Sequence, residues 1–179
     1  MGRVIITAFV SLDGVAEAPE KWSPSYWNSE TEAFKDEELA AHSAMILGRV
    51  TYEAFAQAWP SRTGAYADRL NGMPKYVASS TLKAPAWQGS EVLAGDLAEA
   101  VRGVRQQVDG DIYVHGSIGL SQALLSANLV DELHMLSYPI IVGRGRRLLE
   151  GTPQLEMELI SANGFANGVV ALKYRRHSV

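Results

Sequence analysis

Three short segments of the chain carry residues suited to binding an anion, and each follows an apolar, strand-like stretch. In Gly48–Thr51, the glycine admits close backbone approach, Arg49 can pair with a phosphate, and Thr51 adds a hydroxyl at a helix start. Ser79–Thr81 offers three adjacent hydroxyls to a phosphate or a ribose. Gly116–Leu120 is a glycine turn into a helix, where backbone N–H groups and the helix dipole favour negative charge. Taken alone, each segment is also compatible with an ordinary turn or helix cap.

Two carboxylates stand where they could contact a ligand. Asp13, in a turn with Gly14, ends the first buried strand, and ligands of α/β sheets bind at such carboxyl ends, although Asp-Gly is also a common turn pair. Glu30 and Phe34 are four residues apart and share one helix face, which suits recognition of a heterocycle with an N–H edge. The alternative is that Glu30 belongs to a solvated acidic face. Trp22 provides either a stacking surface or core packing.

The composition excludes several classes of function. The chain of 179 residues has no cysteine, which rules out disulfides, zinc–thiolate sites and cysteine nucleophiles. Its four histidines lack metal-ligand spacing, so we expect no metal site. A net charge of −4 disfavours a nucleic-acid partner, and the apolar run of residues 4–10 is too short to span a membrane. We therefore expect a cytoplasmic protein in which residues 1–179 form a single domain.

Strands and helices alternate along the chain and must position these residues. The predicted strands cover residues 4–10, 44–47, 76–78, 91–93, 111–115, 133–142, 155–159 and 170–175, and the predicted helices cover 29–43, 51–59, 64–71, 97–108 and 117–127. Ser29 with Glu32, and Asp96 with Glu99, fit capping boxes that start two helices. The alternation predicts an α/β sandwich with a mixed, mostly parallel sheet, which ends in an antiparallel hairpin.

Several motifs, taken in their order along the chain, resemble one known family. They are S-L-D-G at 11–14, L-G-R-V-T-Y-E at 47–53, H-G-S-I-G-L at 115–120, L-V-D-E-L at 129–133 and P-I-I-V-G-R-G at 139–145. Together they resemble the dihydrofolate-reductase-like proteins. The resemblance is greatest to stand-alone relatives of the reductase domain of the bifunctional riboflavin-biosynthesis deaminase/reductase.

The resemblance implies a three-layer α/β/α fold with about eight strands, and binding of NADPH. In that family, the three turns described above meet the phosphates, the adenosine 2′-phosphate side and the pyrophosphate of the cofactor. The cofactor-binding residues implied here are Gly48, Arg49, Thr51, Ser79, Ser80, Thr81, Gly116, Ser117, Ile118 and Leu120. Ser117 departs from the usual Gly-Gly pair of the family, but its hydroxyl could donate to phosphate. Arg49, Ser79 and Gly116 must then lie close enough to touch one dinucleotide.

We therefore expect an NADPH-dependent oxidoreductase that transfers a hydride to a C=N or C=O bond of a small pteridine-, pyrimidine- or sugar-like substrate. Asp13 matches the substrate region of the riboflavin-pathway domain and is the first candidate catalytic residue; Glu30, whose spacing from Phe34 matches the folate-reducing enzymes, is the second. The candidate substrate-binding residues are Asp13, Gly14, Trp22 and Phe34. A non-catalytic NADPH-binding module and a true dihydrofolate reductase stay open as alternatives. We also expect a homodimer, by analogy and because such assemblies are common.

Overall fold

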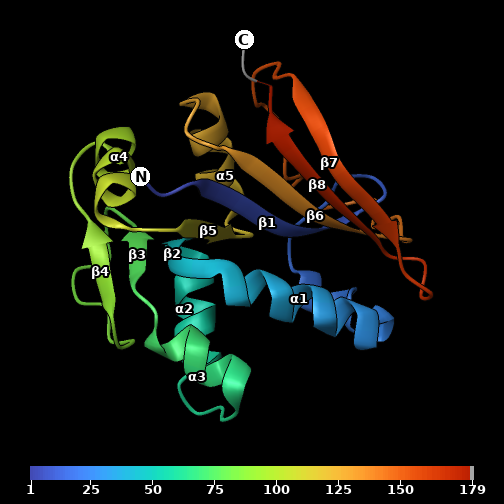
Figure 1. Cartoon of the computed structure of the whole chain (residues 1–179), viewed down its shortest axis with the longest axis horizontal. Helices are drawn as coiled ribbons and strands as arrows, with labels where there is room; N and C mark the ends of the chain where they lie inside the picture. The colour runs from blue at the N-terminus through green and yellow to red at the C-terminus, as the bar shows by residue number, and fades with distance from the viewer. Residues whose placement is uncertain (178–179) are drawn as a thin grey trace.

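A mixed eight-stranded sheet forms the centre of the computed structural model, which describes residues 1–177 (Figure 1). The strands are β1 (Val4–Ser11), β2 (His42–Gly48), β3 (Lys75–Ala78), β4 (Ser90–Leu93), β5 (Asp111–His115), β6 (Glu132–Tyr138), β7 (Met157–Gly164) and β8 (Val170–Arg176). Their order across the sheet is β4-β3-β2-β5-β1-β6-β8-β7. Neighbours from β4 to β6 pair in parallel, whereas β8 pairs antiparallel with both β6 and β7. The predicted mixed sheet with an antiparallel C-terminal pair is confirmed.

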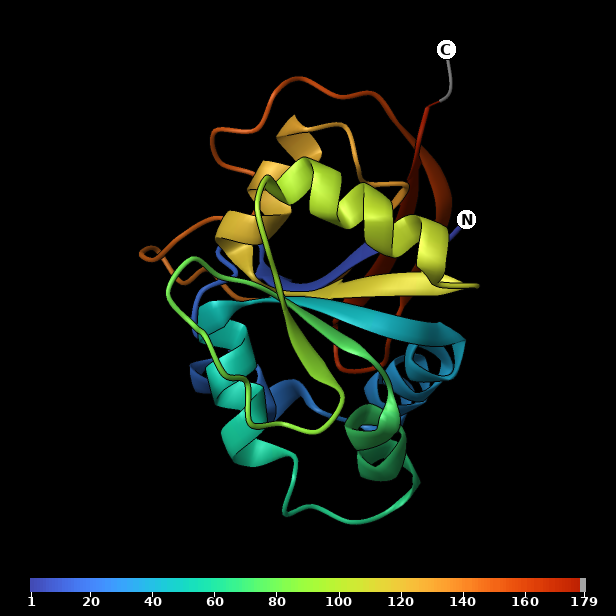
Figure 2. The same cartoon turned by 90° about the vertical axis from the view of Figure 1, so that its left-hand side faces the viewer.

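Helices cover both faces of the sheet and complete the predicted three-layer α/β/α arrangement. They are α1 (Ser29–Ala41), α2 (Arg49–Ala58), α3 (Ala65–Gly72), α4 (Leu97–Gln107) and α5 (Ile118–Ser126), with two short 3-10 turns, η1 (Pro19–Lys21) and η2 (Pro24–Tyr26), before α1. Figure 2 shows α4 and α5 on one face and α1, α2 and α3 on the other. Each helix layer therefore seals one face of the sheet from water.

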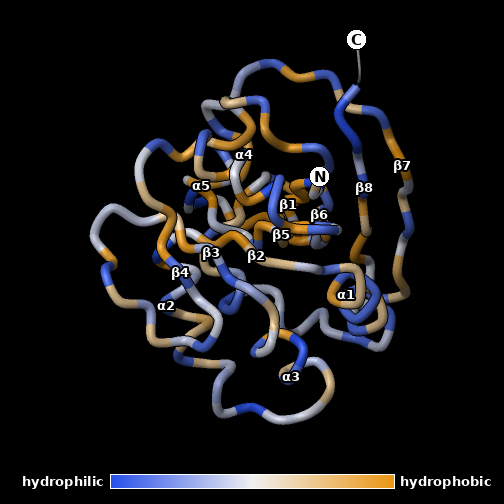
Figure 3. Tube along the Cα trace, turned by 60° about the vertical axis from the view of Figure 1, so that its left-hand side comes forward, coloured by the Kyte–Doolittle hydropathy of each residue, from blue (hydrophilic) through white to orange (hydrophobic). Residues whose placement is uncertain are grey.

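The central strands form because their sequences are apolar on both sides of the pleat. Ile6 of β1, Ile46 of β2 and Val114 of β5 are fully buried on one face, and Met45 and Leu47 of β2 are fully buried on the other. Figure 3 shows this apolar centre as orange segments of the trace around β1, β2 and β5. Burial on both faces fixes these strands in the middle of the sheet, and the polar α1 and β7 lie at its periphery.

Two predicted boundaries are corrected by the structure. The first helix is capped by Asn28 and not by Ser29: the Asn28 backbone is extended, and its side chain accepts the Thr31 N–H at 2.9 Å. The second capping site is confirmed, because the Asp96 carboxylate accepts the Glu99 N–H at 3.0 Å. The predicted strand region 133–142, which Pro139 was expected to interrupt, ends at residue 138 and does not resume, since proline has no N–H for the ladder.

The strand order places the three turns that were predicted to bind an anion side by side. β3, β2 and β5 are consecutive neighbours in parallel, so their carboxyl ends lie at the same edge of the sheet. Residues 48–51, 79–81 and 116–120 follow these ends directly. Helices α2 and α5 begin at this same edge with their N-termini toward it.

Candidate functional site

One large cavity of about 1630 Å³ opens at the carboxyl edge of the parallel strands. Most of the predicted cofactor-binding residues line it: Gly48, Arg49, Thr51, Ser79, Ser80, Gly116, Ser117, Ile118 and Leu120. Two of the turns are also joined directly, because the Gly48 N–H donates to the Ser117 hydroxyl at 3.0 Å. Arg49, Ser79 and Gly116 therefore face one space, which is the geometry that a single dinucleotide requires.

The turn after β5 depends on two consecutive residues with left-handed backbone. Gly116 has φ +50° and Ser117 has φ +48°. Glycine adopts this conformation without steric cost, but serine does so rarely. The Ser121 hydroxyl donates to the Gly116 carbonyl at 2.7 Å and holds the turn in place. Because the Ser117 hydroxyl contacts Gly48 instead of capping its own helix, the first N–H groups of α5 face the cavity edge.

Arg49 and the turn at residues 79–81 already form hydrogen bonds within the protein, to different extents. Arg49 donates through Nη1 to both carboxylate oxygens of Glu53, at 2.9 and 3.0 Å, and its side chain is about half exposed. Ser79 accepts the N–H groups of Thr81 and Leu82, at 3.2 and 2.9 Å, so its oxygen closes the turn. Thr81 itself is exposed and is not a wall residue of the cavity.

Asp13 lies beside the cavity, and its carboxylate forms hydrogen bonds with the loop after β6. Its carboxylate accepts the Ser11 hydroxyl at 2.7 Å and the N–H groups of Val142 and Gly143, at 3.0 and 2.9 Å. The Ser11 hydroxyl and these backbone N–H groups lower the pKa of Asp13 to about 2. Gly14 has φ +80° and forms the turn. Neither residue lines the cavity, so this geometry favours a structural role for the carboxylate.

Glu30, Phe34 and Trp22 lie on the far side of α1 and of the loop before it. Glu30 accepts the N–H of Ala166 at 2.7 Å in the turn between β7 and β8. Phe34 is buried against that same turn, and the Trp22 ring packs edge-on against Tyr138. Glu30 and Phe34 do share a helix face, as predicted, but that face packs against β8 and the β7–β8 turn, and none of the three lines the cavity.

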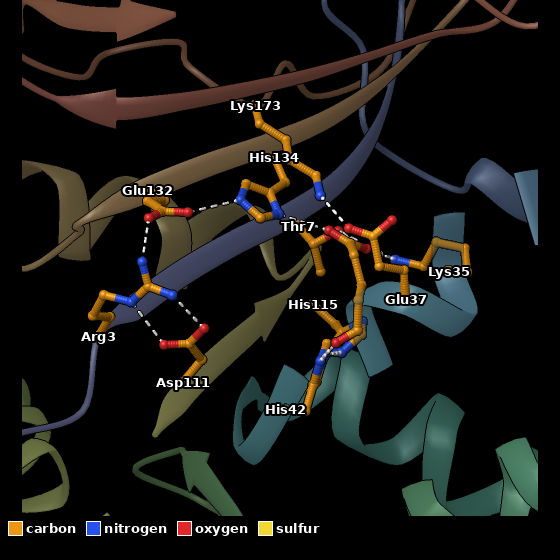
Figure 4. Close-up of polar contacts among 11 residues, drawn as sticks. Arg3, Thr7, Lys35, Glu37, His42, Asp111, His115, Glu132, His134 and Lys173 are labelled. Carbon is orange, nitrogen blue, oxygen red and sulfur yellow. Dashed lines mark hydrogen bonds and ion pairs between the residues drawn. The ribbon is translucent and has the colours of Figure 1, made fainter. Parts of the chain in front are cut away.

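The face of α1 that reaches the cavity carries Glu32, Lys35 and Asp36. Lys35 is the buried member of this set, with a side chain 8% exposed. Its ammonium contacts the Glu38 carboxylate at 2.5 Å and donates to the Thr7 hydroxyl at 3.2 Å. The Thr7 hydroxyl in turn donates to Glu38 at 2.9 Å. A positive charge is therefore held rigidly at the cavity wall, where β1 meets α1 (Figure 4).

The polar contacts continue from Glu38 to the opposite edge of the sheet (Figure 4). The other carboxylate oxygen of Glu38 lies 2.9 Å from Nδ1 of His134, and Nε2 of His134 lies 3.0 Å from Glu132. Glu132 accepts from Arg3 at 2.6 Å near the surface. Burial favours a raised pKa for Glu38, but the Lys35 charge and the His134 contact outweigh it and hold the pKa well below its usual range.

A pair of histidines also contacts the Glu38 residue, through its backbone carbonyl. His42 lies with Nδ1 against the Glu38 backbone carbonyl, and its Nε2 is 2.8 Å from Nε2 of His115, which lines the cavity. The carbonyl can only accept, so His42 donates from Nδ1, and His115 must donate to His42. Burial lowers the pKa of His42 to about 4 and that of His115 well below its usual value. Both rings are therefore neutral at pH 7.

Part of the cavity wall is aromatic. It is lined by Phe9 with Trp27, whose ring centres are 6.4 Å apart, and by Trp59 with Tyr66, whose ring centres are 5.4 Å apart. The Arg62 guanidinium lies 4.5 Å from the centre of the Trp59 ring, so a positive charge lies against this ring. Aromatic faces next to a cation suit a planar, polar ring.

A family comparison agrees with this geometry. Residues 3–171 match the model of the RibD C-terminal domain. The chain belongs to the RibD C-terminal domain family. That membership indicates a reductase-like protein, which is the relationship that the sequence motifs predicted.

Individual relatives of this RibD-type chain are distant but similar over its whole length. The uncharacterized protein YyaP of Bacillus subtilis (strain 168) is 21% identical over 96% of this chain and 94% of its own. A Shewanella sp. PV-4 protein assigned to riboflavin biosynthesis has a TM-score of 0.80 at 20% identity, covering 98% and 99% of the two chains. The Thermotoga maritima diaminohydroxyphosphoribosylaminopyrimidine deaminase/5-amino-6-(5-phosphoribosylamino)uracil reductase has a TM-score of 0.70 at 13% identity, covering 98% of this chain and 57% of its own. These structures share the fold.

Sequence reasoning missed Lys35, Glu38 and His134 of this RibD-type chain. Lys35 and Glu38 are three apart on α1, so they lie on the same side of the helix as the buried Leu39. A helix whose buried side carries two charges must pair them, but only the structure shows that this side is buried. Within residues 1–177, no group of three or more His, Asp or Glu side chains is placed to hold a metal ion, and no helix there is long and apolar enough to cross a membrane.

Proposed function

We propose that this RibD-type chain is an NADPH-dependent reductase that acts on a C=N or C=O bond of a small pyrimidine-like substrate. The observation that carries the proposal is the convergence of three turns on one cavity, at the carboxyl ends of β3, β2 and β5. Parallel sheets bind their ligands at such edges. The proposed substrate class follows the name of the Thermotoga maritima neighbour, a 5-amino-6-(5-phosphoribosylamino)uracil reductase fused to a deaminase.

The residues present fit a dinucleotide phosphate. Two helices, α2 and α5, begin at the cavity without a side-chain cap, so their first N–H groups and dipoles suit phosphate oxygens. Arg49 and Arg146 add positive charge, and Thr51, Ser79 and Ser80 add hydroxyls. The volume of about 1630 Å³ exceeds the roughly 1,000 Å³ of large single-ligand pockets, which leaves room for a second molecule.

The chain's own part in such a reaction is binding, orientation and exclusion of water. When bound, the reduced nicotinamide supplies a hydride. Residues at the helix N-termini would hold the phosphates, and aromatic wall residues such as Trp27 and Trp59 would hold the substrate ring. The neutral His115 lines the same cavity and can form hydrogen bonds without adding charge.

Binding of NADPH tests the first half of the proposal. Titration followed by tryptophan fluorescence should show saturable binding, and Arg49→Ala should weaken it by about 1.5–3 kcal/mol, the scale of a lost charge-assisted hydrogen bond. Arg102→Ala is the matched control, because Arg102 is exposed on α4 and outside the cavity wall. Equal affinity of the Arg49 and wild-type proteins would contradict this map of the cofactor site.

Turnover tests the second half. Loss of NADPH absorbance should follow addition of 5-amino-6-(5-phosphoribosylamino)uracil or a related pyrimidine. Rapid turnover of dihydrofolate instead would identify a folate reductase. Saturable NADPH binding without oxidation across pyrimidines, pteridines and sugars would indicate a non-catalytic binding module.

A further inference from the structure

The buried positive charge on α1 needs an explanation beyond stability. Lys35 and Glu38 have side chains 8% and 1% exposed, and a methionine–leucine pair of similar volume could fill the same space. Removing two charges from water costs several kcal/mol each, which their mutual attraction repays only in part, so a buried ion pair contributes little net stability. Lys35 nevertheless borders the cavity, and this position connects its charge to ligand chemistry.

The geometry leaves one N–H of the Lys35 ammonium available. An ammonium has three N–H donors, and the Thr7 hydroxyl and the Glu38 carboxylate take two of them within residues 1–177. The nitrogen also lies 5.6 Å from the centre of the Phe9 ring, and Phe9, Thr7 and Lys35 all line the cavity. A planar substrate ring lying against these aromatic walls would present its edge to the remaining N–H.

We propose that Lys35 is the catalytic residue that contacts the reducible bond of the substrate and protonates it, and that Glu38, His134 and Glu132 return the proton from the opposite edge of the sheet. The proposal rests on the proposed reductase function and names the acid that this function requires. It replaces Asp13 and Glu30, whose carboxylates hold backbone N–H groups elsewhere.

In the proposed reduction, the reduced nicotinamide is the reductant and Lys35 is the acid. The carbon of the C=O or C=N bond gains a hydride, and the π electron pair moves to the heteroatom. That heteroatom forms a bond to a proton of Lys35, while the Nζ–H bond breaks and its electron pair stays on nitrogen. The Glu38 carboxylate then takes the Nδ1 proton of His134, while His134 takes a proton at Nε2 from the Glu132 side, where solvent supplies it. Glu38 passes its proton to the amine, which restores the Lys35 ammonium and the Glu38 carboxylate.

The contacts of Glu38 explain why it can carry a proton to Lys35 only after Lys35 has lost one. The charge of Lys35 is the main influence that keeps the pKa of Glu38 low against the effect of burial. Once Lys35 is neutral, that influence is gone and burial favours the protonated carboxyl. His134 lies 2.9 Å from Oε1 of Glu38 and can supply the proton to that oxygen. Rotation of the protonated carboxyl group would then bring the proton to the Lys35 amine, which lies beside the other oxygen. Glu38 is therefore a carrier only after Lys35 has reacted.

The far end of the path reaches a second, smaller cavity. This space of about 280 Å³ is lined by Glu38, His134, Glu132 and Arg3 among others, at the edge where β1, β5 and β6 begin. Thr7 and Arg3 are four residues apart on or beside β1, so the path spans about 13 Å along the strand. Protons can thus enter while a bound substrate fills the main cavity.

Lysine NMR tests contact with the substrate independently of turnover. The chain has five lysines, so a protein labelled with ¹³C at Cε gives five signals, and Lys35→Met assigns one of them. Addition of 5-amino-6-(5-phosphoribosylamino)uracil without nucleotide should shift the Lys35 signal and leave that of Lys173 in place. A Lys35 signal that does not move overturns the proposal. If this signal moves but the wild-type protein does not oxidise NADPH, the proposed reductase function is wrong. The contact between Lys35 and the added pyrimidine is then still supported.

Kinetics test the chemical role. Lys35→Met should lower turnover by about 100-fold or more, the contribution of a general acid, while NADPH affinity stays within about twofold of wild type. Lys173→Met is the matched control, because Lys173 pairs with Glu37 outside the main cavity. Turnover of the Lys35 variant within about threefold of wild type would refute the assignment.

His134→Gln separates the return path from a structural role. Glutamine keeps an N–H donor but cannot carry a proton. The first turnover uses the proton already on Lys35 and should proceed at the wild-type rate, whereas steady-state turnover should fall about tenfold or more. Equal slowing of both phases would show that His134 only supports the structure, and unchanged steady-state turnover would show that protons enter by another route; either result overturns the relay.

Discussion

Acid should destabilise this fold through the buried pair of His42 and His115. Their Nε2 atoms lie 2.8 Å apart, so one ring must donate and the other accept. A proton on His42 would place two N–H groups against each other in a buried site, where Tyr113 is stacked on the His42 ring. Burial accordingly lowers the pKa of His42 to about 4, and that of His115 is lowered in the same direction.

The size of the effect follows from the His42 pKa. In the unfolded chain this histidine has an ordinary pKa of about 6.5, so between that value and 4 the unfolded state binds more protons than the folded state. Stability therefore falls as the pH is lowered through this window. At about pH 5 the difference is about 1.5 pH units, or about 2 kcal/mol from His42 alone. His115 adds to the loss.

Urea unfolding at about pH 7.5 and about pH 5, followed by tryptophan fluorescence, measures this loss. His42→Asn is the control, because asparagine can donate to the Glu38 carbonyl but does not titrate. This variant should be less stable at the higher pH and should lose less on acidification. The low-pKa carboxylates, Glu38 and Asp13, lose their contribution only below about pH 4.5, which is lower than either pH of this measurement. Equal pH dependence of the variant and the wild type would refute the reasoning.

Three substitutions and one size measurement test other parts of the structure. Lys75→Met should lower the free energy of unfolding by about 3 kcal/mol in urea titrations, because the buried ammonium donates to three backbone carbonyls; unchanged stability would contradict this. Gly48→Ala should preserve the Tm, since its Cβ would stay 3.5 Å from Ser117, yet should weaken NADPH binding. Asp13→Asn should speed hydrogen exchange at the amides of 142–143, because it weakens the bonds that hold this loop. Light scattering should give about twice 19.4 kDa, and a single-chain mass would remove the proposed homodimer.

The fold could be predicted where local sequence and burial agree. β5 covers the predicted residues 111–115, because an apolar run there is bounded by an aspartate–glycine turn and a second glycine. The three turns at 48–51, 79–81 and 116–120 were also predicted from local signals, since each turn directly succeeds a buried strand, but their convergence on one cavity was not. Which strands are neighbours is a property of the whole sheet, so that part came from the family resemblance.

The residues of α1 could not be assigned in the same way. A helix is normally oriented by its apolar stripe, but the buried positions of α1 include Thr31, Lys35 and Glu38 beside Phe34 and Leu39. The sequence therefore shows no single apolar face from which to infer which side meets the sheet. The spacing of Glu30 and Phe34 selected a face that packs on β8 and the β7–β8 turn, about one third of a turn away from Lys35.

A carboxylate at the carboxyl end of a strand can contact a ligand or hold the loop that shapes the binding site, and Asp13 shows how contacts decide between the two. Both of its oxygens accept backbone N–H groups of 142–143, and its carbonyl accepts from Arg147 at 2.8 Å. The adjoining Arg146 lines the cavity, and its backbone N–H donates to the Glu17 carboxylate at 3.1 Å. Asp13 thus fixes the loop that carries Arg146, a cationic residue of the cavity wall. This role explains why the S-L-D-G motif has an aspartate even though its carboxylate does not contact the substrate.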